Sequence, residues 1–409
     1  MKISKDPSIL VLTSWSLKEG LIQAYTLPYL SIIQSITGLS TRFFLSTLEK
    51  KACALSDKEQ QAYKGGLKKK NVFWKPNKYN PFGLRSMINM LRLFINLVIL
   101  IKREKITVIH AICTPSGMLG YLLSRLTSTP LVIDSLEPHA EKMLQSETWS
   151  RYNLRYRLLS YFERKQAEHA SHCITATNDD SFYITHYGMN KENSGYKPAC
   201  VDLDKFMIND QLRNKIRNEY NITNDCIVGI YIGKLGGMYL ENEVFDFCKA
   251  AISKWGANFR FIILNNQKKK VDELIRDEEL DSITFIHEYI DHSEMVGYLN
   301  AADFAFCSHK PIPANRYSTP IKNGEYWACG LPIVIPDGIS EDSNLVKEHG
   351  IGSVLASLTE DSYQESVKVI DKLLQEDKKQ LQSRIRKVAE KYRGYYLAEE
   401  AYKKAYETE

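Results

Sequence analysis

The segment Cys226-Ile-Val-Gly-Ile-Tyr-Ile-Gly233 is an apolar run that ends in glycine, and an amphipathic helical pattern over 241–255 follows it. A second apolar run, Phe259-Arg-Phe-Ile-Ile-Leu264, comes directly after that helix. Strands without a polar face, separated by helices, are typical of parallel sheets that helices cover on both sides. The segment therefore predicts an α/β fold.

The same alternation of strand and helix extends through the rest of the chain. We expect further strands at 8–13, 40–47, 105–110, 130–134, 172–177, 283–287, 304–308 and 332–336. The pattern restarts after Pro198, and the tail over 380–406 reads as one long charged helix. These features predict two Rossmann-like domains that face each other across a cleft, with ligands bound at the carboxyl ends of the strands.

Length and composition agree with two globular domains. The 409 residues exceed what one core usually supports, and 44% hydrophobic with 25% charged residues is ordinary for a globular protein. This composition excludes a disordered, collagenous or small disulfide-stapled chain. The net charge of +5 is too small for a protein that coats nucleic acid, although it allows a local basic patch.

Cysteine usage and the apolar segments predict a cytoplasmic protein. None of the eight cysteines forms a C-x-x-C pair, which favours reduced thiols in a reducing compartment. We expect no secretory signal, because the first 15 residues carry charges and a proline before a short apolar run. The longest apolar stretch, 87–101, contains Arg92 and is shorter than the ~20 residues that cross a membrane. We expect it to be a helix packed on a sheet that also touches lipid.

The glycine-rich turn after the first quoted strand is a candidate anion site. Gly233 and Gly236 would let the backbone approach a ligand closely, and Lys234 would supply a positive charge to a diphosphate. The helix that follows would offer unpaired N–H groups. A tight turn between strand and helix explains the same residues, so spacing alone leaves both readings open.

The segment Arg316–Val334 is the second candidate. Ser318 and Thr319 before a proline predict the N-terminal cap of a helix that begins near Lys322. Glu325, one turn into that helix, could accept hydrogen bonds from ribose hydroxyls. A structural role for Glu325 at the helix dipole and a solvated Lys322 are the alternative.

This second segment resembles the donor-nucleotide signature of retaining glycosyltransferases of family 4, which have the GT-B fold. The signature reads approximately S-P-x-K-x-x-E-Y-x-A-x-G-L-P-V, and the matching residues are Ser318, Pro320, Lys322, Glu325, Tyr326, Ala328, Gly330, Leu331 and Pro332. Weaker similarities follow the order of the family along nearly the whole chain. They lie at 23–30, 48–50, 200–206 and 298–303.

The resemblance implies an enzyme that moves a hexosyl or N-acetylhexosaminyl group from a nucleotide-diphosphate sugar to an acceptor hydroxyl, with retention and without a metal or other cofactor. The acceptor would be a glycan or a lipid-linked saccharide. Residues 1–203 would be the acceptor domain and 204–390 the donor domain, with a helix at 391–409 returning to the N-terminal domain. The donor nucleotide would contact Gly20, Gly233, Lys234, Gly236, Ser318, Thr319, Lys322 and Glu325.

The loop after the strand at 130–134 would lie near the transferred sugar in this family. His139 and Glu137 in that loop are therefore the candidate catalytic residues, able to hydrogen-bond sugar hydroxyls or assist proton movement. Surface polar residues of an ordinary loop are nearly as good an explanation. His287 and His292 are one residue too far apart for an H-E-x-x-H zinc motif, so we expect no metal site.

Three departures from the family pattern limit what the resemblance implies. Tyr317 stands where the first acid of the E-x7-E pair would be, Tyr239 replaces a second basic residue, and Cys200 replaces a glycine at the junction. Two other functions therefore stay open. One is a nucleotide-sugar epimerase of the same fold, and the other is a non-catalytic relative that binds glycan or membrane.

The stretch Lys64–Arg85 is basic and contains no acid. Its aromatic residues Phe73, Trp74, Tyr79 and Phe82 are interleaved with lysines. Such a patch suits an anionic membrane surface or a single-stranded nucleic acid, and a solvated loop is equally compatible. Because the apolar segment follows directly, we expect residues 64–101 to meet a membrane surface at the inner face, and we expect no nucleic acid partner.

Overall fold

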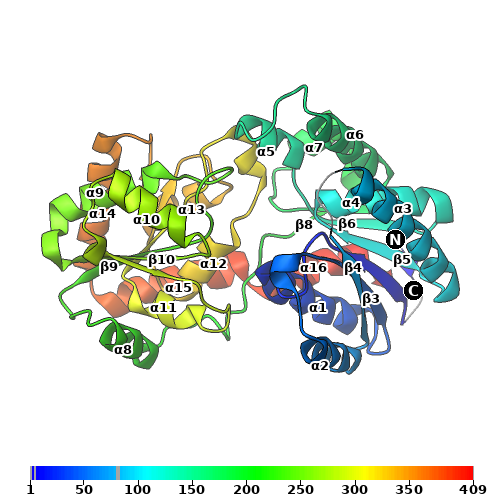
Figure 1. Cartoon of the computed structure of the whole chain (residues 1–409), viewed down its shortest axis with the longest axis horizontal. Helices are drawn as coiled ribbons and strands as arrows, with labels where there is room; N and C mark the ends of the chain where they lie inside the picture. The colour runs from blue at the N-terminus through cyan, green and yellow to red at the C-terminus, as the bar shows by residue number, and fades with distance from the viewer. Residues whose placement is uncertain (1, 4–5, 80–82, 409) are drawn as a thin grey trace. The chain divides into compact units, whose positions relative to one another are not determined.

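The computed structural model describes residues 2–3, 6–79 and 83–408, so the expected aromatic contact at Phe82 lies outside the described residues. Contacts along the chain define two compact units (Figure 1). The first contains Met1–Glu141, Ser150–Pro198 and Tyr396–Glu409, and the second contains Lys142–Trp149 and Ala199–Tyr395.

The first unit is built on a seven-stranded sheet in which every neighbouring pair is parallel. Its strands in spatial order are β4 (Val72–Lys78), β3 (Arg42–Glu49), β2 (Ser8–Leu12), β5 (Val108–Ile112), β6 (Leu131–Leu136), β7 (His172–Thr175) and β8 (Ser194–Tyr196). The strand order reverses between β2 and β5. A short pair, β1 (Lys2–Ile3) with β15 (Glu407–Thr408), joins the two ends of the chain.

The helices of the first unit lie on both faces of this sheet. They are η1 (Ile22–Thr26), α1 (Leu27–Thr37), η2 (Lys51–Cys53), α2 (Asp57–Lys68), α3 (Leu84–Arg103), α4 (Thr114–Thr127), α6 (Leu154–His169), α7 (Ser181–Tyr187), η3 (Lys191–Asn193) and α16 (Tyr395–Ala405). Helix α5 (His139–Gln145) begins in the first unit, and its residues from Lys142 on belong to the second. Because parallel crossovers are right-handed, α1 and α2 cover one face, while α3, α4 and α6 cover the other (Figure 1).

A buried polar cluster fastens α16 to the first unit. Asp134, within β6, is fully buried and pairs with Lys197 at 3.1 Å, and the hydroxyl of Tyr402 donates to it. Burial would raise the pKa of Asp134, but the charge of Lys197 outweighs burial and holds that pKa below its usual range. Tyr406 contacts His110 Nδ1 at 2.5 Å. The C-terminal helix therefore belongs to the core of the N-terminal unit.

The second unit contains a six-stranded parallel sheet. Its strands in spatial order are β11 (Phe285–Glu288), β10 (Phe259–Leu264), β9 (Ile227–Ile232), β12 (Phe304–Phe306), β13 (Ile333–Pro336) and β14 (Gly352–Leu355). The order reverses between β9 and β12. The two parallel sheets confirm the predicted fold class.

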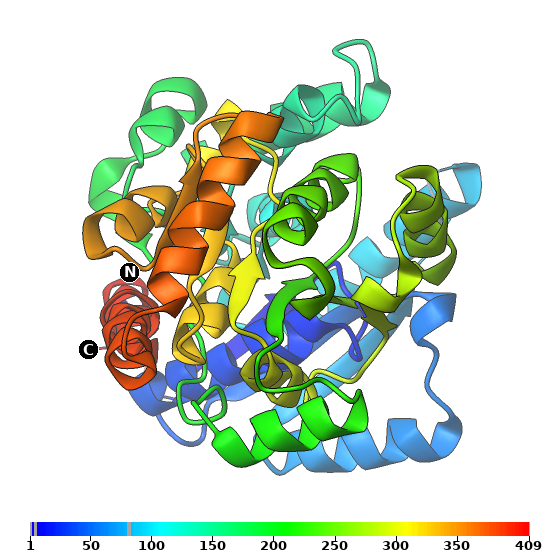
Figure 2. The same cartoon turned by 90° about the vertical axis from the view of Figure 1, so that its left-hand side faces the viewer.

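The helices of the second unit again alternate with its strands. They are α8 (Asp210–Glu219), α9 (Asn242–Trp255), η4 (Gly256–Asn258), α10 (Lys268–Asp277), η5 (Ser282–Thr284), α11 (Met295–Ala301), η6 (Pro313–Tyr317), α12 (Ile321–Ala328), α13 (Asp342–His349), α14 (Glu360–Leu374) and α15 (Lys378–Arg393). Helix α14, orange in Figure 2, packs beside α9 and closes one face of the sheet.

Two sequence-based expectations were wrong. The C-terminal tail is two helices, α15 and α16, because the chain is extended at Gly394 (φ −69°, ψ 150°) and this break ends the helical hydrogen-bond pattern. The basic stretch expected to offer aromatic residues to a membrane, with a solvated loop as the alternative, contains strand β4. In this strand Trp74 is buried and donates to Thr47 Oγ1 at 2.8 Å. Trp74 is therefore a core residue that cannot touch a membrane.

Candidate active site

The predicted nucleotide residues of the second unit lie where its strand order reverses. Ligands of open α/β sheets bind at such a point, beyond the carboxyl ends of the strands. The glycine loop follows β9, and the segment leading to α12 follows β12, which is the neighbour of β9. The backbone of Leu240 donates to Ser308 O at 2.6 Å, and Tyr326 Oη accepts from Ile232 N at 3.1 Å. These bonds hold the two predicted segments together.

Helix α12 is buried along most of its length, which fixes the side chains it carries. A Cβ atom on Gly324 would meet Val201 Cγ2 at 2.7 Å and Arg393 Cγ at 3.1 Å, so glycine allows the close approach of the helix to these residues. Asn323 donates to Asp342 at 2.8 Å, and Asp342 also pairs with Arg393.

Glu325 and Lys322 come together on one side of α12. Glu325 Oε2 accepts from Lys322 Nζ at 2.7 Å, and the carboxylate is only 1% exposed. Burial would raise the pKa of Glu325, but the charge of Lys322 and the contact with His292 outweigh burial, and that pKa lies below its usual value. The site therefore holds an ionised, buried carboxylate.

His292 and Lys205 complete a polar chain that the sequence did not reveal. His292 Nε2 lies 3.3 Å from Glu325 Oε1, and Lys205 Nζ lies 2.8 Å from His292 Nδ1. An ammonium group only donates, so Nδ1 accepts and Nε2 carries the proton that His292 gives to Glu325. Burial lowers the pKa of Lys205. The sequence drew attention to His292 only as part of a zinc-like motif. Lys205 lies within the segment 200–206, which resembles the family pattern but indicated no role for this lysine.

Ser318 and Thr319 do not cap α12 as expected. Pro320 occupies the N-cap position and no side chain makes a cap hydrogen bond, because the two residues precede the cap rather than form it. Ser318 is buried, and its hydroxyl has no hydrogen-bond partner among the described residues. A buried hydroxyl of this kind is costly unless something else pairs with it, so Ser318 stays a candidate ligand contact.

The glycine loop has the backbone that only glycine adopts easily. Gly233 and Gly236 have φ of +154° and +82°, and a Cβ on Gly236 would lie 2.2 Å from Glu241 Oε2. Lys234 is exposed, and no side-chain partner is recorded for it in the described part of the chain. Helix α9 begins at Asn242, within one residue of the expected start, and residues 238–241 lie between it and the glycines.

The predicted catalytic pair of the first unit also lies together. His139 Nδ1 is 3.3 Å from Glu137 Oε1, and both side chains are about one-fifth exposed, at 22% and 23%. They follow β6, at its carboxyl end. Behind them, buried Glu163 accepts from Ala140 N at 2.9 Å, and burial raises the pKa of Glu163 to about 8. Glu163 thus positions the start of α5, a role that its place in an ordinary helix pattern did not suggest.

Gly20 lies after β2, at the start of the helical segment that continues into η1, beside the reversal of strand order in the first unit. It is exposed, and an added Cβ would meet nothing within 4 Å. The fold itself therefore gives no reason for glycine at this position.

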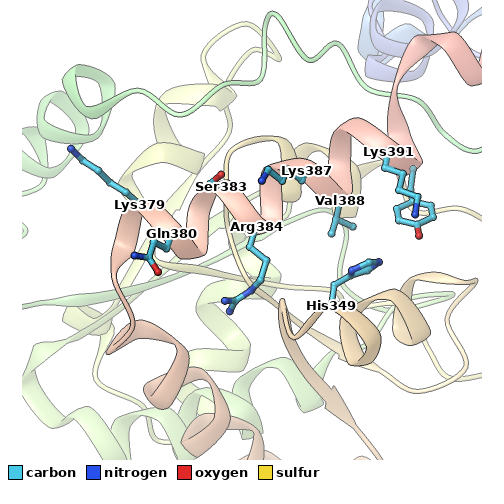
Figure 3. Close-up of a pocket in the computed structure, with 9 residues that line it drawn as sticks. His349, Lys379, Gln380, Ser383, Arg384, Lys387, Val388 and Lys391 are labelled. Atoms are coloured by element: carbon cyan, nitrogen blue, oxygen red, sulfur yellow. The ribbon is translucent and has the colours of Figure 1, made fainter.

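One cavity lies away from all these residues. It has a volume of about 560 Å³ and follows α15, where Lys379, Arg384 and Lys387 line it opposite His349 (Figure 3). Among the described residues, no group of three or more His, Cys, Asp or Glu side chains could hold a metal ion.

Comparisons with known proteins agree with this architecture. Residues 249–405 match the family model "Glucosyltransferase 3-like, C-terminal domain". No curated protein sequence matches the chain.

Several solved structures share its fold. Anabaena HepE, solved in complex with UDP-glucose, is 17% identical with a TM-score of 0.69, and the alignment covers 97% of this chain and 98% of HepE. WaaG, a glycosyltransferase involved in lipopolysaccharide biosynthesis, is 14% identical with a TM-score of 0.71 over 97% and 98%. Sucrose-phosphate synthase from Thermosynechococcus elongatus is 12% identical with a TM-score of 0.71 over 97% and 96%. The chain has the GT-B fold, and its matched family domain together with that fold supports a glycosyltransferase function.

Proposed function

We propose that the chain is a retaining glycosyltransferase that moves a hexosyl group, glucosyl in the first instance, from a UDP-sugar to an acceptor hydroxyl. The observation that carries this proposal is the Lys322–Glu325 pair at the point where strand order reverses in the second unit. The match of residues 249–405 to a glucosyltransferase-like domain and the UDP-glucose complex of a protein with this fold support the choice of donor.

When the donor binds, ribose hydroxyls replace Lys322 as hydrogen-bond partners of Glu325. Each carboxylate oxygen can accept two hydrogen bonds, so Glu325 has acceptor positions left for ribose hydroxyls. It is only 1% exposed beneath Lys322 and His292, however, so ribose reaches it once Lys322 turns toward the diphosphate. Lys322 and exposed Lys234 then neutralise the charge that develops on the departing UDP. These cations would supply the stabilisation without a metal ion.

The acceptor side is assigned to the first unit. We propose that residues 1–203 form the acceptor domain, 204–390 the donor domain, and 391–409 the helix that completes the first. Glu137 and His139 would hydrogen-bond the sugar or the attacking hydroxyl, and Gly20 would contact the diphosphate through its backbone. The acceptor would be a glycan or a lipid-linked saccharide at the cytoplasmic face of a membrane.

Calorimetry with uridine, UDP and UDP-glucose tests the donor site. Glu325→Ala removes charge-assisted hydrogen bonds of about 1.5–3 kcal/mol and should weaken all three ligands. Lys322→Ala should weaken UDP far more than uridine. Lys347→Ala, which removes an exposed lysine paired with Asp337 in the same unit, is the matched control and should change neither affinity. Unchanged UDP affinity in Glu325→Ala would refute the ribose assignment.

A second experiment tests the reaction. Proton NMR of the product formed from UDP-glucose should show retention at the anomeric carbon, and EDTA should leave turnover intact. An inverted product or loss of turnover on chelation would overturn those parts of the proposal. Conversion of the nucleotide sugar to its epimer without an acceptor would instead identify an epimerase.

A further inference from the structure

Helix α3 exposes an apolar stripe on the side opposite to its packed face. Leu93, Leu97 and Leu100 are buried against the first unit. Residues two positions away from a buried one point in nearly the opposite direction on a helix. Leu91, Ile95 and Ile99 occupy such positions, and Met87 and Ile88 continue the stripe toward the start of the helix. All five side chains are between 46% and 65% exposed. An ordinary surface helix would be polar there.

The two neighbouring helices continue this apolar surface. Helices α3, α4 and α6 lie in one layer over the same face of the sheet, with α4 packed between the other two. Further exposed apolar side chains in this layer are Leu122 and Leu126 on α4 and Leu154, Leu158 and Tyr161 on α6. We call these ten side chains and the arginines among them the α3–α4–α6 face.

The charges on this face have one sign. Helices α3 and α4 contain no acidic residue, and in α6 Glu163 is buried while Glu168 pairs with Lys165 at 2.8 Å. Four exposed arginines have no ion-pair partner among the described residues: Arg92, Arg125, Arg157 and Arg164. Unpaired cations around an exposed apolar surface are the features that bind an anionic lipid surface.

We propose that the α3–α4–α6 face docks the protein on an anionic membrane surface. The apolar stripe would enter the headgroup region while the arginines meet lipid phosphates. In the described part of the chain no helix is long and apolar enough to span a bilayer, so the contact is peripheral. A second copy of the chain is a poorer occupant, because it would bring two sets of arginines together with no acids on α3 or α4 to pair with them.

This face keeps the apolar segment 87–101 of the region expected to meet a membrane, but it leaves out the basic aromatic part of that region. Lys68 ends α2, on the opposite face of the sheet, and buried Trp74 in β4 offers no apolar contact. Phe73 stacks on Phe44 with ring centroids 5.2 Å apart. The lysines at 68–70 therefore lack exposed aromatic neighbours from β4, and they provide a charge-matched control.

Sedimentation of the full chain with vesicles tests the proposal. Vesicles of phosphatidylcholine with phosphatidylglycerol should bind the wild type at low salt, and phosphatidylcholine alone should bind it much less. Leu91→Glu with Ile95→Glu should reduce the bound-to-free ratio at least tenfold, as should Arg92→Glu with Arg157→Glu. The matched controls Leu39→Glu and Ile283→Glu change exposed apolar residues elsewhere and should bind as wild type does.

The outcomes are separable from those of the nucleotide site. UDP affinity should stay unchanged in every face variant, which also reports that each variant is folded. The proposal is overturned if the wild type ignores anionic vesicles at low salt, or if Leu91→Glu with Ile95→Glu binds them normally. It is also overturned if only Lys68→Glu with Lys69→Glu and Lys70→Glu abolishes binding. A wild-type dimer that the face variants convert to monomers, without vesicle binding, would assign the face to a second copy.

Discussion

Replacing Lys322 by methionine tests whether the buried carboxylate depends on its partner. Methionine keeps the apolar part of the side chain but removes the charge that lies 2.7 Å from Glu325 Oε2. Removing one partner of a fully buried ion pair costs about 3–5 kcal/mol, since the other charge is left uncompensated. Lys322 is 29% exposed and His292 still contacts Glu325, so we expect a loss of about 1–3 kcal/mol.

A double variant separates the buried charge from other effects of the substitution. Glu325→Gln added to Lys322→Met removes the uncompensated charge and should recover most of the lost stability, although UDP binding stays weak. Lys347→Met is the control, because its pair with Asp337 is about half exposed, and such pairs contribute about 0–1 kcal/mol. The pKa of Glu325 is lowered from 4.5, so the pair should stabilise the fold above that pH and lose its effect as the pH falls further.

Hydrogen exchange of the α12 amides, with urea unfolding of the whole chain, measures these differences without assuming that both units unfold together. Exchange in Ile321–Ala328 should be faster in Lys322→Met and return toward wild type in the double variant. The reasoning is refuted if Lys322→Met protects α12 as well as Lys347→Met does, or if the double variant is no more stable than the single one.

Three further substitutions follow from buried or strained groups. Burial raises the pKa of Glu163 from 4.5 to about 8, so its contribution is complete below pH 4.5 and is lost as the pH rises through 8. In wild type the free energy of unfolding should fall by up to about 1.4 kcal/mol per pH unit for this reason, and Glu163→Gln should remove that fall. Urea midpoints of both proteins at pH 5.5 and 8.5 measure the difference. Lys197→Met should destabilise the first unit by about 3–5 kcal/mol and Asp134→Asn should restore much of it, and urea unfolding without such rescue would contradict the buried pair. Gly236→Ala should impair UDP binding in calorimetry, because the backbone at position 236 has a positive φ. Gly20→Ala should leave the fold intact. If both substitutions are tolerated equally well, the loop assignment is contradicted.

The sequence predicted the buried strands well and the edge strands poorly. Phe259–Leu264 is apolar except for Arg260 because sheet and helices cover both of its faces, and its bounds in the structure match the expectation. Strand β4 lies at a sheet edge, where lysines and Pro76 are tolerated, so its pattern looked like a loop. Strands β8 and β14 also lie at sheet edges, and they were missed because glycine and serine interrupt any apolar run in them.

The same contrast explains what could be predicted of the site. Lys322 and Glu325 are three residues apart on one helix, so their contact follows from local geometry alone. His292 reaches the same carboxylate, and Lys205 reaches His292, from segments far away in the sequence. Only the packed fold brings them together. The N-cap expected at Ser318 was wrong because local preference alone does not place the start of a helix. Serine is a favourable cap, but the helix uses Pro320, two positions later.

The charges around Glu325 connect its burial to the proposed order of binding. Lys205 and Lys322 contribute two positive charges against the one carboxylate of Glu325. His292 accepts a hydrogen bond from Lys205 and donates one to Glu325, so it adds no charge of its own. The two lysines and the carboxylate sum to about one positive charge; Lys234 adds one, and Asp202 near Lys205 subtracts one. The site is therefore cationic, which favours the diphosphate of the donor over a bare nucleoside. When Lys322 turns to the diphosphate, Glu325 loses its strongest partner while it is still buried, and ribose hydroxyls become its best replacement. Phosphate binding thus prepares ribose binding. The losses of UDP affinity in Lys322→Ala and Glu325→Ala should therefore be strongly non-additive when the two substitutions are combined.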